Sequence, residues 1–342
     1  MSDDEYFEDD DDLDDEDFDD DEPFNMEDLR DGDYLPPGVR PCRGDGDNME
    51  SLLKGLEPRQ NDFLRLAMGA LQGTPIEELQ KETNIEALDV FMRRICLTTR
   101  AKLVGTEVWD TIQEAKAKIE RHGWTSPRSL RKRPGGEEYR PSFSQVDEMA
   151  KELRDLALSE THLSEPVPVR MRALLGNTIK KLAKRDTEDT MKARWSEYKT
   201  AKCKNLDERK VPHPAVLREG WGSKSINYYK GMKPPISTVL FQLRTECIQL
   251  KEYLADRGIL PDGDTHCKFC PWRHETVDHL FNWCPKFEHQ RRILKDRVGW
   301  SFNNLFTKHG YHAAEFAFQL FELESFDWSR EHMMDEYKLN SF

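Results

Sequence analysis

The chain has 342 residues, of which 34% are charged and 37% hydrophobic, and its formal net charge is −14. Residues 1–22 contain sixteen acidic residues and no basic one, so residues 23–342, with 49 acidic and 51 basic residues, are close to neutral.

No apolar run approaches the roughly twenty residues that cross a membrane, so we expect no membrane contact. The acidic start argues against a signal peptide or a mitochondrial transit peptide. Seven cysteines without a secretory signal favour reduced thiols. We therefore expect an intracellular protein, nuclear or cytoplasmic.

Residues 1–50 are expected to be a disordered acidic arm and linker, because such a stretch buries too little apolar surface to offset the entropy of ordering. Aromatic side chains such as Tyr6 and Phe18 are spaced through the acid. Two interpretations stay open. The arm is a solvating tail, or it docks onto a basic protein partner or the protein's own basic surface.

Residues 51–123 are expected to form a helical domain. Apolar residues recur at helical spacing, namely Phe63, Leu64, Ala67, Met68 and Leu71. We expect Gly73 to end this first helix and Gly123 to end the last one.

Residues 124–216 are read as a basic linker followed by charged helices. One basic cluster holds Lys180, Lys181, Lys184 and Arg185, and a second surrounds Trp195. Basic residues between aromatic rings suit a nucleic-acid face. The alternative is an ordinary amphipathic helix with Trp195 turned inward.

The most specific chemistry lies in residues 267–284, where Cys267 and Cys270 are followed by His279 and Cys284. Thiolate and imidazole are the ligand types that zinc prefers, and four of them complete a closed tetrahedral site. A helix from about Glu275 would present the last two ligands toward the Cys-x2-Cys turn. We therefore predict a small CCHC zinc-knuckle-like segment with a structural zinc ion. The alternative is a turn and a helix with ordinary buried cysteines.

A helical domain over residues 217–328 is expected to contain this segment, with a tail over 329–342. The apolar stripe that should pack on the zinc segment comprises Ile236, Val239, Leu240, Leu243, Cys247, Leu250 and Leu254. Farther along, Phe316, Leu320 and Phe321 are expected to be core residues. The predicted fold class is thus mainly α.

Residues 62–103 carry a pattern that is shared with a known family. A helix ending in small residues is followed by a Thr-Pro pair and a basic helix. The matching positions are Gly69, Thr74, Pro75, Leu79, Glu82, Ile85, Leu88 and Arg93. This stretch resembles the region downstream of the reverse transcriptase domain in fungal non-LTR (LINE-type, Tad-like) retrotransposon polyproteins.

Residues 237–291 carry a second, more specific match. The matching positions are Ser237, Leu240, Gln242, Leu243, Arg244, Thr245, Ile248, Leu250, Leu254, Cys267, Cys270, Glu275, Thr276, Val277, His279, Cys284, Pro285 and Arg291. This stretch is similar to the zinc-knuckle-like segment that follows the RNase H domain in the same elements. Glu246 stands where the family has glycine, which favours a continuous helix at that point.

The two enzymes of those polyproteins are not expected in this chain. No Tyr-x-Asp-Asp motif occurs in a strand-like context, and residues 124–216 lack the alternating Val, Ile and Thr of an RNase H sheet. The resemblance therefore implies a truncated, non-catalytic derivative without a small-molecule substrate.

The expected activity is binding of RNA or single-stranded DNA through four basic residues around the knuckle. These residues are Arg244, Lys268, Arg273 and Lys286. Two alternatives remain: an adaptor whose acidic arm recruits partners, and a retrotransposon relic without function.

Overall fold

The computed structural model describes residues 47–122, 143–205, 214–260, 264–271, 273–299, 302–327 and 329. Almost all of the predicted acidic arm and tail, and the basic linker that begins at residue 124, lie outside these ranges. Within them, the one β-type pairing is an isolated antiparallel bridge between His266 and His274. The prediction of a mainly α protein is confirmed.

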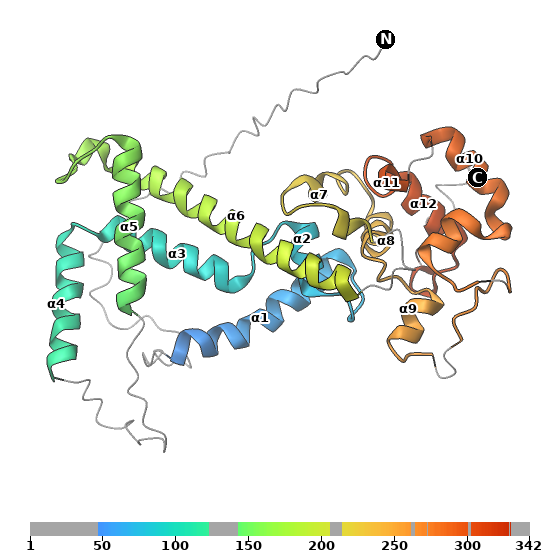
Figure 1. Ribbon diagram of the computed structural model, residues 1–342, viewed down its shortest axis with the longest axis horizontal. Coiled ribbons are helices and arrows are strands. Elements are labelled where there is room, and N and C mark those ends of the chain that lie inside the picture. The colour runs from blue at the N-terminus through green and yellow to red at the C-terminus, as the bar shows by residue number, and fades with distance from the viewer. Residues whose placement is uncertain are drawn as a thin grey trace, which may run out of the picture. The chain divides into compact units, whose positions relative to one another are not determined.

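Helices account for most of the described chain (Figure 1). The N-terminal part contains α1 (Asp47–Met68), α2 (Ile76–Thr83), α3 (Leu88–Leu103), α4 (Glu107–His122), α5 (Phe143–Thr161) and α6 (Arg172–Asn205). The C-terminal part contains α7 (Lys224–Asn227), α8 (Pro234–Thr245), α9 (Lys251–Asp256), α10 (Glu288–Val298), α11 (Phe302–Leu305) and α12 (Gly310–Leu320). None of the described helices is both long and apolar enough to cross a membrane.

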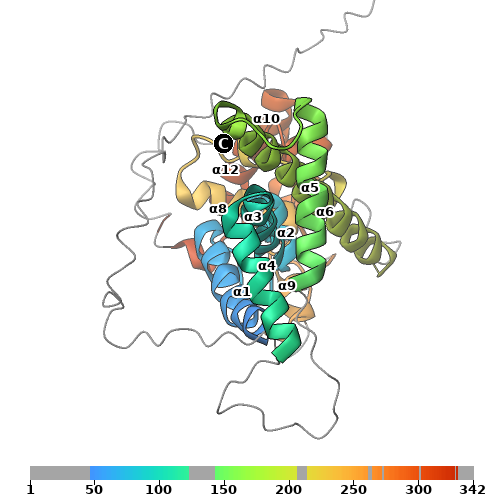
Figure 2. The ribbon, with the colours of Figure 1, turned by 90° about the vertical axis from the view of Figure 1, so that its left-hand side faces the viewer.

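Helices α3, α5 and α6 pack against one another, and Figure 2 views this group with α4 and α5 toward the reader. Small and branched side chains fill the space between them, including Ala101, Ala157 and Ile179, all with no exposed surface. On α6, Trp195 is also buried, and its ring nitrogen donates to the carbonyl of Glu219 at 2.9 Å. The interpretation of this segment as a helix with Trp195 turned inward is therefore confirmed.

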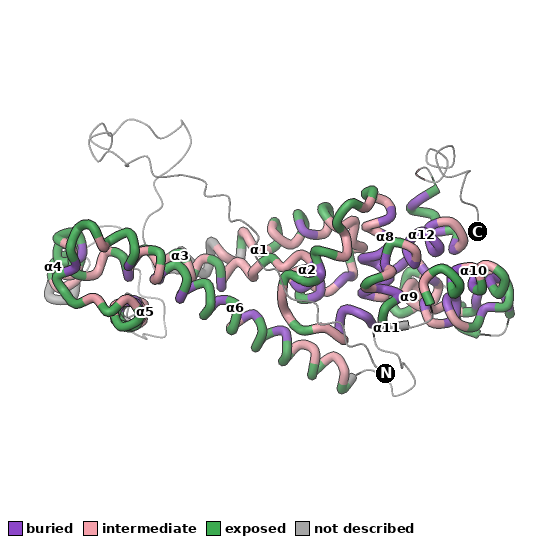
Figure 3. Tube along the Cα trace, turned by 90° about the horizontal axis from the view of Figure 1, so that it is seen from above, coloured by how far each residue is buried: buried purple, intermediate pink, exposed green. Residues whose placement is uncertain are grey.

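The largest core cluster lies around α8 and α12, where Figure 3 shows the densest burial. Phe281 meets the rings of Phe316 and Phe321, with centroid distances of 5.3 Å in each pair. Leu320 packs against the same cluster, so the three predicted core residues near the C-terminus are confirmed. The apolar stripe predicted over residues 236–254 contributes five of its seven members to this cluster, namely Ile236, Val239, Leu240 and Leu243 on α8 and Leu250 just before α9.

The end of α1 differs from the prediction, because Met68, not a residue near Gly73, is the last helical residue. Gly69 follows with φ of +61°, a left-handed conformation that glycine adopts without a steric cost. A Cβ atom at Gly69 would lie 2.4 Å from Oγ1 of Thr238. The chain therefore turns here because α8 approaches the backbone, and the Gly69 carbonyl accepts a hydrogen bond from Nε2 of Gln242 at 2.9 Å.

The end of α8 also differs from the prediction. Glu246 has φ of +55°, so the helix stops at Thr245 and does not continue. The turn directs Ile248 and Leu250 into the core, where each is at most 2% exposed. Burial of these two side chains outweighs the cost of a left-handed residue other than glycine.

The predicted division into domains at 51–123, 124–216 and 217–328 stays a prediction. All described residues belong to one compact unit that starts at Gly46. Within it, Leu64 of α1, Leu79 of α2 and Phe241 of α8 share one small core, so the first and third of these segments are in direct contact.

Candidate metal centre

A narrow backbone hairpin holds the Cys-x2-Cys turn. The amide of Cys267 donates to the carbonyl of Arg273 at 2.8 Å, and the amide of Glu275 donates to the carbonyl of Thr265 at 2.8 Å. The amide of Phe269 points at Sγ of Cys267, 3.4 Å away. These bonds close the loop and turn both sulfur atoms toward the interior.

The other two ligands come from a π-helical turn, His279–Trp283. The amide of Cys284 donates to the carbonyl of His279 at 2.8 Å, five residues back. An α-helix would separate two such positions around its axis, whereas the wider π turn brings them to the same side. Thr276 Oγ1 accepts the amide of His279 at 2.9 Å, as expected for a residue that begins the helix. Helix geometry at this site is therefore π, not the ordinary α type.

The four predicted ligands converge on one point. Their donor atoms all lie within 4.8 Å of one another, and all four residues are buried. Sγ of Cys267 is 4.0 Å from Sγ of Cys284, and Sγ of Cys270 is 3.2 Å from Nε2 of His279. In tetrahedral zinc the same atom pairs would be about 3.8 and about 3.6 Å apart. The donor set and its spacing fit this ion.

The protonation states of the cluster are compatible with the binding of a cation. Burial raises the pKa of the Cys284 thiol to about 12 and raises that of Cys267 as well. Burial, together with the charges of Arg273 and Arg291, lowers the pKa of His279. The imidazole is therefore neutral with a free lone pair, and a bound dication would stabilise the thiolates.

Two charged side chains brace the ligands. Glu275 is 1% exposed, and its Oε2 accepts the amide of Lys268 at 2.9 Å, inside the Cys-x2-Cys loop. Arg291 donates to the carbonyl of Cys284 at 2.7 Å and to that of Leu280 at 3.2 Å. Both residues belong to the motif positions quoted above, and their role here is to fix the backbone on which the ligands sit.

Three of the predicted nucleic-acid contacts are exposed next to this centre. Lys268, Arg273 and Lys286 all lie on the surface, and Nζ of Lys268 bonds the carbonyl of Glu322 at 3.0 Å. The guanidinium of Arg273 stacks 5.4 Å above the ring of Trp283, which is 58% exposed. Sequence reasoning missed Trp283, although an aromatic residue directly before a ligand cysteine was the available signal.

Arg244 lies elsewhere, and the prediction that it contacts nucleic acid is wrong. Its side chain has no exposed surface, and it donates to both carboxylate oxygens of Glu82, to Glu219 and to the carbonyl of Phe306. Burial would lower the pKa of Arg244, but the two carboxylates outweigh it and raise this pKa. All its donor groups face the protein interior, so Arg244 holds the fold together and cannot reach a phosphate.

No protein-family model, curated protein sequence or solved structure matches this chain.

Proposed function

We propose that Cys267, Cys270, His279 and Cys284 bind one structural zinc ion. The observation that carries this proposal is the convergence of four buried soft donors within 4.8 Å. Four protein ligands leave zinc no open coordination position, which suits a structural role. When bound, the ion supplies positive charge that keeps the thiols ionised inside the core. A reducing compartment, nuclear or cytoplasmic, would keep these thiols available.

We further propose that the surface beside this centre binds RNA or single-stranded DNA. Trp283 and Arg273 offer an exposed aromatic ring with a cation stacked on it, and Lys268 and Lys286 add positive charge nearby. Bases of any sequence stack on aromatic side chains, and cations neutralise phosphates. One small surface predicts modest affinity that falls with salt.

We also propose that the chain is a non-catalytic derivative of the C-terminal part of a fungal LINE-type polyprotein. In support, four of the matching positions form two bonded pairs. Gly69 accepts a hydrogen bond from Gln242, and Glu82 pairs with Arg244. Each pair joins one stretch of the resemblance to the other. If the chain is a relic without function, the surface around Trp283 need not bind any ligand. The binding test below distinguishes this alternative.

The test uses the full chain. Metal analysis should find about one zinc per chain in the wild type and none in Cys284→Ser, the count that a four-ligand site requires. A folded wild type without zinc would overturn the metal site.

Binding of a labelled single-stranded oligonucleotide is then followed by fluorescence anisotropy. Trp283→Ala should weaken binding about tenfold, whereas Trp283→Phe should retain most of it, because a ring is kept. Equal affinity of the Ala variant and the wild type would overturn the proposal that the Trp283 surface binds nucleic acid, and absence of salt-dependent binding by the wild type would favour the adaptor.

A further inference from the structure

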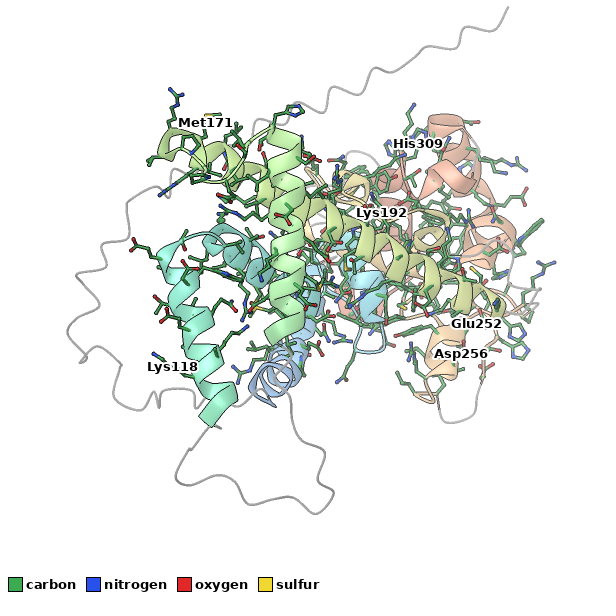
Figure 4. The ribbon with its side chains drawn as sticks, turned by 60° about the vertical axis from the view of Figure 1, so that its left-hand side comes forward. Lys118, Met171, Lys192, Glu252, Asp256 and His309 are labelled. Atoms are coloured by element: carbon green, nitrogen blue, oxygen red, sulfur yellow. The ribbon has the colours of Figure 1, made fainter. Side chains whose placement is uncertain are left out.

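The start of α6 carries a concentrated positive charge that the metal centre does not use. Residues 169–185, the short 3-10 turn Val169–Met171 and the first half of α6, contain six basic residues and no acidic one. Residues 186–205, the second half, contain five basic and four acidic residues. Figure 4 shows the two regions at Met171 and Lys192, well separated along the helix.

The cations of the second half of α6 are mostly neutralised within the fold. Arg194 forms two hydrogen bonds with Asp89, Lys192 pairs with Asp189 at 3.2 Å, and Lys202 bonds Glu78 at 3.2 Å. The aromatic ring of Trp195 is buried among them. Three of the five cations of this half are therefore paired with carboxylates, and the buried ring of Trp195 is not available to a ligand.

The first half is different. Leu175, Ile179 and Leu182 form its buried face against α3 and α5. Lys180, Lys181 and Lys184 lie on the other side and are exposed. Within the part of the chain that the structure describes, none of these three ammonium groups has a hydrogen bond or an ion pair. We call these three residues the lysine stripe.

No described carboxylate forms an ion pair with the lysine stripe, although exposed acidic side chains lie on α5 (Glu148, Glu152 and Asp155) and one turn farther along α6 (Glu188). On the adjoining α5, Glu160 pairs with Arg185 at 3.4 Å, and Asp147 pairs with Arg100 and Lys116. Two more exposed cations, Arg170 and Arg172, extend the charge toward the helix start.

We propose that the lysine stripe, with Arg170 and Arg172, binds the sugar–phosphate backbone of a nucleic acid without reading its bases. At 1.5 Å per residue, the helix from Arg172 to Lys184 is about 18 Å long. Duplex DNA places one phosphate per 3.4 Å along each strand, so this length faces about five phosphates. This surface does not depend on the zinc site or on Trp283.

An anionic membrane is the less suitable partner for the same charge. A helix that lies in a membrane surface buries a broad apolar face in the lipid. The apolar face of α6 is instead covered by α3 and α5. On the 3-10 turn and the described first half of α6, the large apolar side chains that are exposed are Val169 and Leu174, at 76% and 47%.

The test compares two triple variants of the full chain with equal charge change. Lys180→Gln/Lys181→Gln/Lys184→Gln removes the lysine stripe. Lys192→Gln/Arg194→Gln/Lys202→Gln removes the three cations of the second half of the same helix that are paired with carboxylates. Circular dichroism first establishes that both variants keep the wild-type helical signal and melting temperature.

Affinity for labelled oligothymidylate of about 30 nucleotides is measured from about 0.05 to 0.2 M KCl. The slope of log affinity against log salt should fall by about 2 in the lysine-stripe variant, because about 0.7 is lost for each phosphate contact with a single strand. The control variant should keep the wild-type slope. An unchanged slope in the lysine-stripe variant, or an equal loss in both variants, would overturn the proposal.

The outcome is separable from that of the knuckle proposal. Trp283→Ala removes no charge, so it should lower affinity without altering the slope. Loss of slope in the lysine-stripe variant with no effect of Trp283→Ala would support the lysine stripe and reject the knuckle surface. Binding of the wild type to phosphatidylserine vesicles but not to the oligonucleotide would reject the lysine stripe as a nucleic-acid site.

Discussion

Arg244 of α8 and Glu82 of α2 form a fully buried, bidentate ion pair. Nε and Nη2 of the arginine lie 2.8 and 2.9 Å from the two carboxylate oxygens, and neither side chain has exposed surface. Removing one member takes away the bidentate partner of a buried charge and leaves Arg244 with Glu219, or Glu82 with the more distant Lys81. Breaking a buried pair in this way typically costs about 3–5 kcal/mol. Glu82→Gln and Arg244→Gln should each lower the free energy of unfolding by about 3 kcal/mol or more, measured by urea denaturation.

The exposed pair of Glu288 and Arg292 on α10 serves as the matched control. Arg292→Gln should change the free energy of unfolding by less than about 0.5 kcal/mol. Similar losses in Arg244→Gln and Arg292→Gln would mean that burial of the first pair has no energetic consequence, contrary to our expectation.

Gly69 should be intolerant of a side chain. Its positive φ and the close approach of Thr238 both oppose a Cβ atom. We expect Gly69→Ala to lower the free energy of unfolding by about 2 kcal/mol. Gly55 lies inside α1, and a Cβ atom added there would meet no other atom within 4 Å, so Gly55→Ala should instead raise stability by about 0.5–1 kcal/mol. Two changes of the same sign would contradict this assignment.

Glu246 allows the opposite substitution, because here a residue other than glycine has a positive φ. It occupies a left-handed conformation at the position where the resembling family has glycine. Glu246→Ala and Glu246→Gly remove the same carboxylate, but only glycine relieves the backbone. The Gly variant should therefore be more stable than the Ala variant by about 1 kcal/mol in thermal or chemical denaturation. An Ala variant as stable as the Gly variant would argue against a strained turn.

Asp147 should contribute to acid sensitivity. Burial opposes its charge, but hydrogen bonds from Lys116 and Gln113 and the charge of Arg100 prevail and lower the pKa of Asp147. A carboxyl with a lowered folded-state pKa stabilises the protein fully above its unfolded pKa of about 3.9, and this stabilisation is lost as the pH falls through the folded value. The difference in unfolding free energy between wild type and Asp147→Asn should thus shrink below about pH 4. A difference that stays constant from neutral to acid pH would count against this role.

Removal of the metal should destabilise the C-terminal helices, since the ligands join the hairpin to the π-helical turn within the main core. A zinc chelator should lower the melting temperature of the wild type and should have no effect on Cys270→Ser, which lacks one ligand. Cys203 lies on α6, away from the cluster, so Cys203→Ser should respond as the wild type does. Chelator resistance of the wild type would speak against a stabilising ion.

Local features of the fold could be predicted from the sequence. The convergence of the four candidate ligands follows from spacing within a few dozen residues and is found as expected, and five of the seven residues of the predicted apolar stripe lie in the main core. The environment of Arg244 could not be predicted, because its main partner lies 162 residues earlier in the chain. The ends of α1 and α8 were missed for the same reason: tertiary contacts, not local turn signals, decide where each helix stops.

The contacts of Arg244 and Gln242 have a practical consequence for anyone dividing this protein into pieces. A fragment starting at residue 217 would retain all four metal ligands and would lose Glu82, the Gly69 carbonyl and the apolar side chains of Leu64 and Leu79. Its arginine would then have Glu219 as its one remaining carboxylate, and Phe241 would be uncovered. Expression boundaries drawn around the cysteine motif alone would therefore cut through the small core that Phe241 shares with Leu64 and Leu79, whereas a start near residue 47 keeps it whole.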